Sequence, residues 1–115
     1  MDIQTKRIYE KPANRDGTRI LIDRVWPRGV SKGDAKLDEW MKEIAPSTEL
    51  RKWFDHEEER FDDFSKKYKK ELENHSKLVQ QLLEKAKDKR LTLLYGAKDE
   101  KHNQAIVLKN YLENQ

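Results

Sequence analysis

The amino-acid sequence predicts an α/β protein with a small mixed, mainly parallel sheet of about three or four strands, flanked by about four to five helices. Two short apolar runs, Ile20–Ile22 and Leu91–Tyr95, have the continuous hydrophobicity of strands that are covered on both faces. The long stretch between them is helical in its periodicity, so the two strands are expected to run parallel, with a right-handed crossover. Because no linker or repeat interrupts the chain, residues 1–115 are expected to form a single layered domain.

The N-terminal stretch Ile3–Glu10 alternates loosely between apolar and polar residues and predicts a first strand, placed at the sheet edge. The connection that follows, Lys11–Thr18, is rich in turn-forming residues and holds no helical pattern. A parallel pair needs a crossover of about a dozen residues or more, so the first two strands are expected to be antiparallel neighbours.

Four helical segments are predicted from apolar spacing and from capping residues. Leu37, Trp40, Met41 and Ile44 share one helical face, which places a first helix at about Asp34–Ile44, with Ser31 as a plausible N-cap before it. The other three segments are a short helix after Pro46 that is capped by Ser47 or Thr48, a long one from the acidic stretch at Asp55 to about Lys87 that breaks near Asn74–Ser76, and a last one from about Glu100 or Lys101 to Leu112 with Asp99 as its N-cap.

Composition narrows the possible functions. The chain has 115 residues and no Cys, which excludes a disulfide framework, a thiolate metal site and a cysteine nucleophile. The three His are too dispersed for a recognisable metal motif, and no glycine-rich phosphate loop is present, so we expect neither a metal nor a cofactor. No apolar run is long enough for a membrane helix and the N-terminus lacks the apolar core of a signal peptide, so a cytoplasmic location is the default expectation, with no membrane partner.

The charge pattern gives only weak support for nucleic-acid binding. The net charge is +3, and acidic and basic residues are mixed along most of the chain. The basic run Lys66–Lys70 is explained either as a solvated helix face or as a docking surface for nucleic acid. The oligomeric state is left open.

Polar residues follow both predicted parallel strands, and ligands of open α/β sheets tend to bind beyond the carboxyl ends of such strands. Arginine forks suit phosphate or carboxylate, and aromatic faces can stack on a base or a sugar. The predicted ligand-binding residues are Arg24, Trp26, Arg28, Tyr95, Lys98 and Asn103. His102 is the one group there suited to proton transfer near neutral pH, so it is the candidate catalytic acid or base.

Structural roles compete with these assignments. Asp23 and Arg24 could pair with each other's neighbours at the sheet end, Trp26 could plug the core, and Asp99 could serve only as a helix cap. His102 could likewise have no chemical role. Arg51 and His56 form a second polar cluster on the predicted short helix. They could face the site, but their spacing in the sequence does not determine this.

Three motifs, DRVWPRG at Asp23–Gly29, APSTELRKWF at Ala45–Phe54 and LLYGAKDEKHNQAIVL at Leu93–Leu108, resemble the bacterial YeaO-like family, domain of unknown function 488. The resemblance covers nearly the whole chain. It implies a small cytoplasmic α/β domain, and it implies no established activity, cofactor or catalytic residue set.

Together these observations favour a site that binds a phosphate-bearing ligand, a nucleotide or a nucleic-acid element, with hydrolytic chemistry as one option. A non-catalytic binding or adaptor module for a protein or nucleic-acid partner is the alternative, and a purely structural polar seam is the third. A concave pocket lined by His102 would favour the first, a flat cationic face the second, and arginines buried against carboxylates the third.

Overall fold

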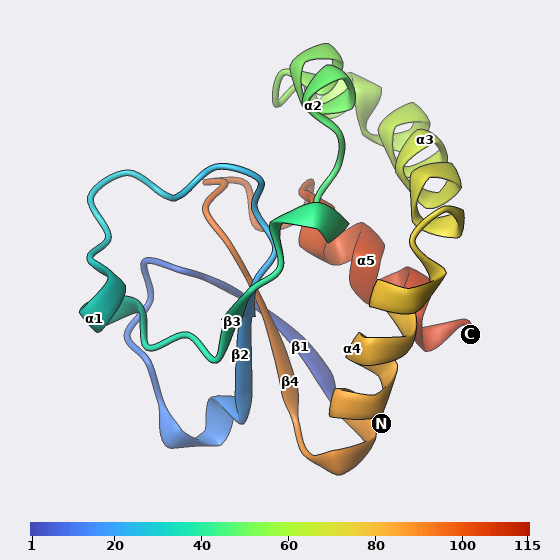
Figure 1. The fold of residues 1–115 in the computed structure, drawn as a ribbon. Coiled ribbons are helices and arrows are strands. Elements are labelled where there is room, and N and C mark those ends of the chain that lie inside the picture. Colours follow the sequence, from blue (N-terminus) through green and yellow to red (C-terminus); the bar gives the residue numbers. More distant parts are fainter.

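The centre of the protein is a four-stranded sheet in which every strand runs parallel to its neighbours (Figure 1). The computed structural model describes all 115 residues. The strands are β1 (Ile3–Arg7), β2 (Thr18–Leu21), β3 (Glu39–Trp40) and β4 (Leu91–Tyr95), in the spatial order β1-β4-β2-β3. The predicted α/β class is therefore confirmed, and the sheet is wholly rather than mainly parallel.

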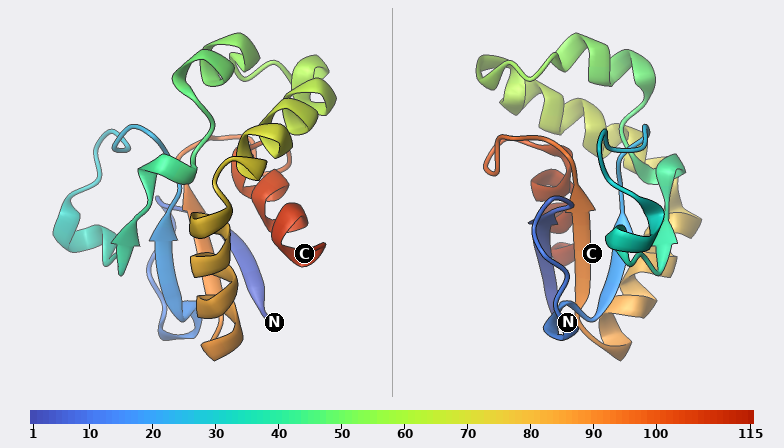
Figure 2. Two further views of the ribbon diagram at one scale, coloured as in Figure 1. Left: turned by 45° about the vertical axis from the view of Figure 1, so that its right-hand side comes forward. Right: turned by 90° about the vertical axis from the view of Figure 1, so that its left-hand side faces the viewer.

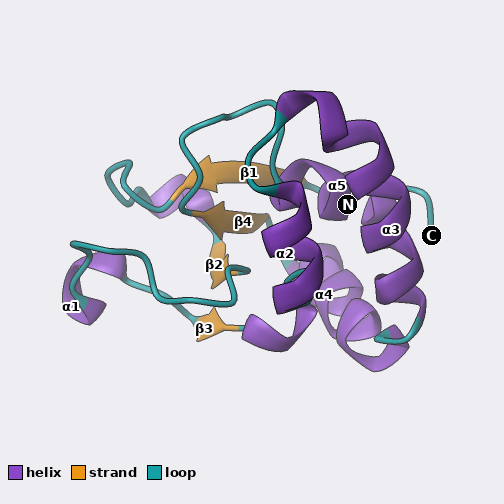
Figure 3. Cartoon of the chain, turned by 90° about the horizontal axis from the view of Figure 1, so that it is seen from above, coloured by secondary structure: helices purple, strands orange, loops and turns teal.

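Five helices surround the sheet unevenly. α3 (Phe61–Glu73), α4 (Ser76–Asp88) and α5 (Gln104–Glu113) lie on one face, and the short α1 (Lys32–Ala35) lies beyond the other (Figure 3). α2 (Thr48–Phe54) stands above the carboxyl ends of the strands (Figure 1). None of these helices combines the length and the hydrophobicity that crossing a membrane would require.

Side chains of the sheet alternate between two separate apolar cores. Ile20, Leu93 and Tyr95 point into the larger core, which the sheet shares with α2, α3, α4 and α5. Leu21 and Leu94 point the other way, into a small core beneath the loops around α1. Both central strands are thus buried on both faces, which explains why their sequences are continuously apolar.

Several local predictions are confirmed. β2 and β4 are parallel neighbours, with Leu21 paired to Leu94. The long helical segment is broken at Asn74 and His75, between α3 and α4. Ser31 caps α1 by accepting a hydrogen bond from Asp34 N, and Ser47 caps α2 by accepting one from Leu50 N.

The expected antiparallel pairing of the first two strands is wrong. β1 and β2 both pair with β4, which lies between them, and both run parallel to it. The crossover rule excludes a short link only between parallel strands that are adjacent, and these two are not adjacent. The residues between Arg7 and Thr18 run back along the sheet and form only a 3₁₀ turn, at Asn14–Asp16. No helix is needed, because an extended chain covers about 3.3–3.6 Å per residue and these residues are enough to span the strands.

The helix predicted at Asp34–Ile44 is also wrong. α1 stops at Ala35, where Lys36 adopts the left-handed conformation with φ 47°. The chain then forms β3, and a 3₁₀ turn follows at Lys42–Ile44. Trp40 packs against the small core, whereas Met41 belongs to the large one, so adjacent residues face opposite sides of the sheet. Pairing with β2 has overridden the helical spacing.

A buried ionic cluster lies at the amino ends of β2 and β4. The carboxylate of Asp16 is 1% exposed, and it accepts from Arg19 Nη1 at 2.6 Å and from Lys6 Nζ at 3.0 Å. Its main-chain carbonyl also accepts from Thr92 Oγ1. Burial opposes ionisation of this carboxyl, but the hydrogen bonds from Ala13 N, Lys6 and Arg19 outweigh it and lower the pKa of Asp16.

Replacing Asp16 by Asn should destabilise the protein by about 3–5 kcal/mol, because it leaves the buried guanidinium of Arg19 without a counter-charge. Urea unfolding at pH 7 measures this loss. Asp2→Asn is the matched control, since it breaks an exposed pair with Arg90 and should cost no more than about 1 kcal/mol. Equal losses in the two variants would contradict a structural role for the Asp16 cluster.

Candidate functional site

The carboxyl edge of the sheet forms one wall of a pocket of about 740 Å³. The loops after β2 and β4 supply this wall, and residues of α2, the turn after it and α3 supply the facing one. Figure 2 shows the arm formed by α2 and the start of α3 standing above the strand ends. The two polar stretches predicted to converge do so here.

Asp23 joins the three elements that meet at this edge. It follows β2, and its Oδ2 accepts from the Gly96 N–H, just after β4, at 2.9 Å. Its Oδ1 accepts from Nε2 of Gln104, the first residue of α5. A Cβ at position 96 would lie 2.8 Å from Asp23 Oδ2, so glycine permits this close approach.

The surroundings of Asp23 disfavour the charged form of its carboxyl group. Burial raises its pKa from 3.8 to about 6, even though the hydrogen bonds from Gly96 and Gln104 and the charge of Arg51 act in the opposite direction. No cation forms an ion pair with it.

Arg24 holds the facing wall in place. Its Nε donates to Pro46 O and its Nη2 donates to Ala45 O, both at 2.9 Å. Part of its side chain lines the pocket, but these donors are used by main-chain carbonyls. The partners are not carboxylates, so the third interpretation, a seam of arginines against acids, does not describe Arg24.

Three further cations line the pocket without an ionic partner. The side chains of Arg28, Arg51 and Lys98 are exposed and form no ion pair in the protein. Arg28 is held through its main chain, because its carbonyl accepts from Tyr9 Oη at 2.8 Å. Together with Arg24, these residues give the lining four fixed positive charges against the two carboxylates of Asp23 and Asp99.

The two predicted aromatic contacts lie in different surroundings. Trp26 lines the pocket, donates from Nε1 to Val30 O at 2.7 Å, and packs edge-on against Trp40. Tyr95 is 2% exposed in the large core and does not line the pocket. The strand alternation explains the difference, since Tyr95 points to the face that the helices cover.

His102 is bracketed by two carboxylates. Its Nδ1 lies 2.9 Å from Asp99 Oδ2, and its Nε2 lies 3.5 Å from Oε1 of Glu58, which precedes α3. The ring packs edge-on against Phe61. Hydrogen bonds from the Lys101 N–H, the His102 ring and the His102 N–H lower the pKa of Asp99.

The sequence predicted Asp99 as the N-cap of the last helix, and this prediction is wrong, because the N-cap is Asn103. Asn103 Oδ1 accepts from the N–H groups of Ala105 and Ile106, so α5 begins at Gln104. Asp99 instead closes the turn that precedes Asn103, because its Oδ1 accepts hydrogen bonds from the N–H groups of Lys101 and His102. Asn103 is 1% exposed, and its amide also donates to Asp99 O.

The pocket thus contains most of the predicted site residues. Those that line it are Arg24, Trp26, Arg28, Lys98, His102 and Asn103, together with Arg51 and His56 from the second predicted cluster. Sequence reasoning did not single out Gln104, and it gave Asp23 only a possible pairing role. The position of Asp23 directly after a buried strand was the available signal.

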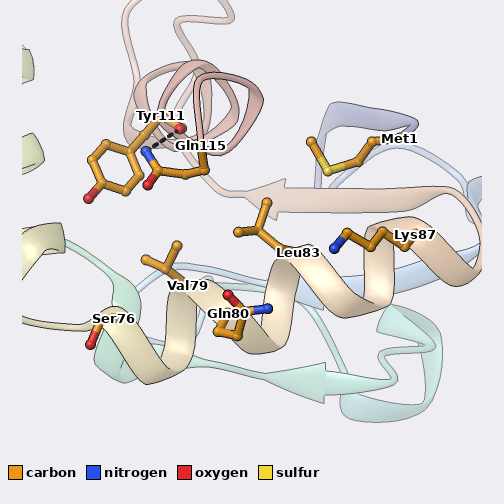
Figure 4. A pocket seen from close by; sticks show the side chains of 8 residues that line it. All are labelled: Met1, Ser76, Val79, Gln80, Leu83, Lys87, Tyr111 and Gln115. Atoms are coloured by element: carbon orange, nitrogen blue, oxygen red, sulfur yellow. Dashed lines mark hydrogen bonds between the residues drawn. The ribbon is translucent and has the colours of Figure 1, made fainter.

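A second hollow of about 630 Å³ lies between α4 and α5, away from the strand ends (Figure 4). Val79 and Leu83 of α4 and Tyr111 of α5 form its apolar part, and Lys87 is its only charged residue. None of the predicted site residues lines it.

Comparison with known proteins identifies the family. Residues 2–115 match the model of DUF488-N3i, which is described as the inactive DUF488-N3 subclade. The chain belongs to the DUF488 family. This membership confirms the resemblance seen in the three sequence motifs.

Two relatives illustrate the similarity within DUF488. The chain is 48% identical over 114 residues to "Uncharacterized protein YeaO" of Escherichia coli strain K12, covering 99% of each chain. It is 42% identical over 78 residues to "Uncharacterized protein Mb3100c" of Mycobacterium bovis, covering 68% of this chain and 66% of that one. No solved structure matches this chain.

Asp23→Asn should become more stable relative to the wild type as the pH rises from 4.5 to 7.5. Because the folded pKa of Asp23 is raised, the native state binds more protons than the unfolded state between about pH 4 and pH 6, and the wild type loses stability across this window. The difference in unfolding free energy should therefore grow by about 2 kcal/mol between pH 4.5 and pH 7.5, from the factor of ~1.4 kcal/mol per pKa unit. Urea unfolding at several pH values measures it.

Asp62→Asn, which removes an exposed carboxylate from α3, serves as the control and should show no comparable rise. Any change in hydrogen bonding at Asp23 is common to all pH values and cancels in the trend. If the difference in unfolding free energy between Asp23→Asn and the wild type stays constant with pH, the raised pKa of Asp23 is contradicted.

Proposed function

We propose that the protein is a non-catalytic binding domain for a phosphate-bearing small molecule of nucleotide size, held at the carboxyl edge of the sheet. The observation that carries the proposal is the set of three cations, Arg28, Arg51 and Lys98, that line one pocket without an ionic partner. Arginine forks bind phosphate oxygens in pairs, and a lysine adds a point charge.

The shape of the site supports a small ligand over a protein or nucleic-acid surface. Its volume of about 740 Å³ lies within the range of about 300–1,000 Å³ that is usual for small-molecule pockets. The site is concave, whereas an adaptor surface for a macromolecule would be expected to present these cations on a flat face. Trp26, which lines the pocket, offers an apolar contact for a base or a sugar.

Two observations favour binding without catalysis. His102 is the only residue that the sequence nominates as an acid or base, and both of its ring nitrogens face carboxylates. The subclade to which the chain belongs is described as inactive. The hydrolytic option is therefore not part of the proposal.

Nucleoside monophosphates and sugar phosphates should raise the melting temperature by about ten degrees when present at about 100 times their Kd, because a ligand that binds only the native state stabilises it by ~2.7 kcal/mol. Arg28→Ala and Arg51→Ala should each weaken binding about tenfold or more, since a hydrogen bond to a charged group contributes ~1.5–3 kcal/mol. Thermal shift followed by calorimetric titration measures both effects.

Lys52→Ala is the control for Arg51, because Lys52 is the next residue of α2, is exposed and does not line the pocket. Lys32→Ala is the corresponding control for Arg28. The proposal is overturned if no phosphorylated compound stabilises the wild type, or if the pocket variants and their controls bind equally well. Turnover of a bound ligand, followed by chromatography, would overturn its non-catalytic part.

A further inference from the structure

We infer that Asp23 is a specificity-determining ligand contact, and that it accepts hydrogen bonds from a pair of adjacent N–H donors of the ligand, as a guanine base provides. This inference rests on the proposed function and names the ligand class of the same site. It depends on the surroundings of one carboxylate.

Stability alone does not explain the charge of Asp23. The carboxylate connects β2, β4 and α5 through hydrogen bonds from Gly96 N and Gln104 Nε2. An asparagine could make the same two connections once the Gln104 amide is turned over, without a charge. Asp23 is half-buried and has no ion-pair partner, and withdrawing a charge from water without pairing it destabilises the native state. A costly group of this kind inside a pocket marks a functional site.

The carboxylate also keeps unused acceptor capacity. Each of its oxygens accepts one hydrogen bond within the protein, and an ionised carboxylate has about four acceptor positions. Asp23 is among the residues that line the pocket, so a ligand can reach it. Arg51 is near enough for its charge to lower the pKa of Asp23, but it forms no ion pair with it.

The pocket therefore presents both a carboxylate acceptor at the strand ends and cations without an ionic partner on its lining. A ligand that matches both has an anionic group and, apart from it, a pair of N–H donors. Guanine carries two adjacent donors, the N1–H and the exocyclic amine, which match the two oxygens of a carboxylate. Adenine places an acceptor nitrogen beside its amine, and a carboxylate repels that acceptor.

The test compares GMP, IMP and AMP by calorimetric titration at pH 7.5. IMP lacks the exocyclic amine of GMP but keeps the N1–H. The wild type should bind GMP about tenfold or more tightly than AMP, with IMP between them, since one charge-assisted hydrogen bond is worth ~1.5–3 kcal/mol. In Asp23→Asn the affinity for GMP should fall to near that for AMP, while the affinity for AMP changes less than about threefold. Asp62→Asn should keep the full preference.

The outcomes separate this inference from the proposed function. Equal binding of GMP and AMP that still requires Arg51 overturns the role of Asp23 and leaves the phosphate site intact. A preference for GMP that survives in Asp23→Asn also overturns that role. If no nucleotide or other phosphorylated compound binds, both proposals fall.

The role of Asp23 can also be tested on the wild type alone, by changing the ligand instead of the protein. If Asp23→Asn does not fold, wild-type binding of N1-methyl-GMP, in which one donor is blocked, takes its place. We expect it to bind about tenfold more weakly than GMP, and equal affinity would overturn the inference.

Discussion

The parallel pairing of β2 with β4 is the constraint on which the rest of this structure depends. Parallel neighbours begin at the same edge, so the chain must return the full length of the sheet between them. Here the chain first forms α1 and β3 and then returns through α2, α3 and α4, and α2 lies above the carboxyl ends of the strands (Figure 1). The pocket is therefore a consequence of connectivity, because the returning arm forms a second wall opposite the strand ends.

The arm is fixed to the sheet through one short segment, residues 44–47. Tyr68 of α3 donates its hydroxyl proton to Ile44 O, and Arg24 donates to the next two carbonyls. Glu71 of α3 accepts from both the N–H and the Oγ–H of Ser47. These bonds satisfy the polar main-chain groups of the link between the 3₁₀ turn at Lys42–Ile44 and α2, and they explain why Arg24 has less freedom to bind a ligand than Arg28 or Arg51. A wall held in this way is preorganised, which reduces the entropic cost of binding.

The sequence was informative where a residue's role follows from its neighbours along the chain, and it misled where the role follows from contacts across the fold. Continuous apolar runs predicted β2 and β4 and hence the edge at which polar residues meet. The helical spacing from Leu37 to Ile44 was misleading because β3 alternates about the sheet and serves both cores. Asp99 looked like an N-cap because Asn103, which takes that role, lies only one turn further on. The donors of Arg24 could not be assigned, since their acceptors are main-chain carbonyls that carry no sequence signal.

Asp16, which is buried, and Asp23, which is half-buried, show how this fold treats an acid at each edge of its sheet. At the amino edge, Asp16 is matched by Arg19 and Lys6, and its pKa is lowered. At the carboxyl edge, Asp23 is given two hydrogen bonds but no cation, and its pKa is raised to about 6. A cation is present near Asp23, because the charge of Arg51 acts on its pKa, but Arg51 forms no ion pair with it. The uncompensated charge therefore lies at the carboxyl edge, where α/β sheets bind their ligands, and a ligand that donates hydrogen bonds to Asp23, as we propose, would stabilise it.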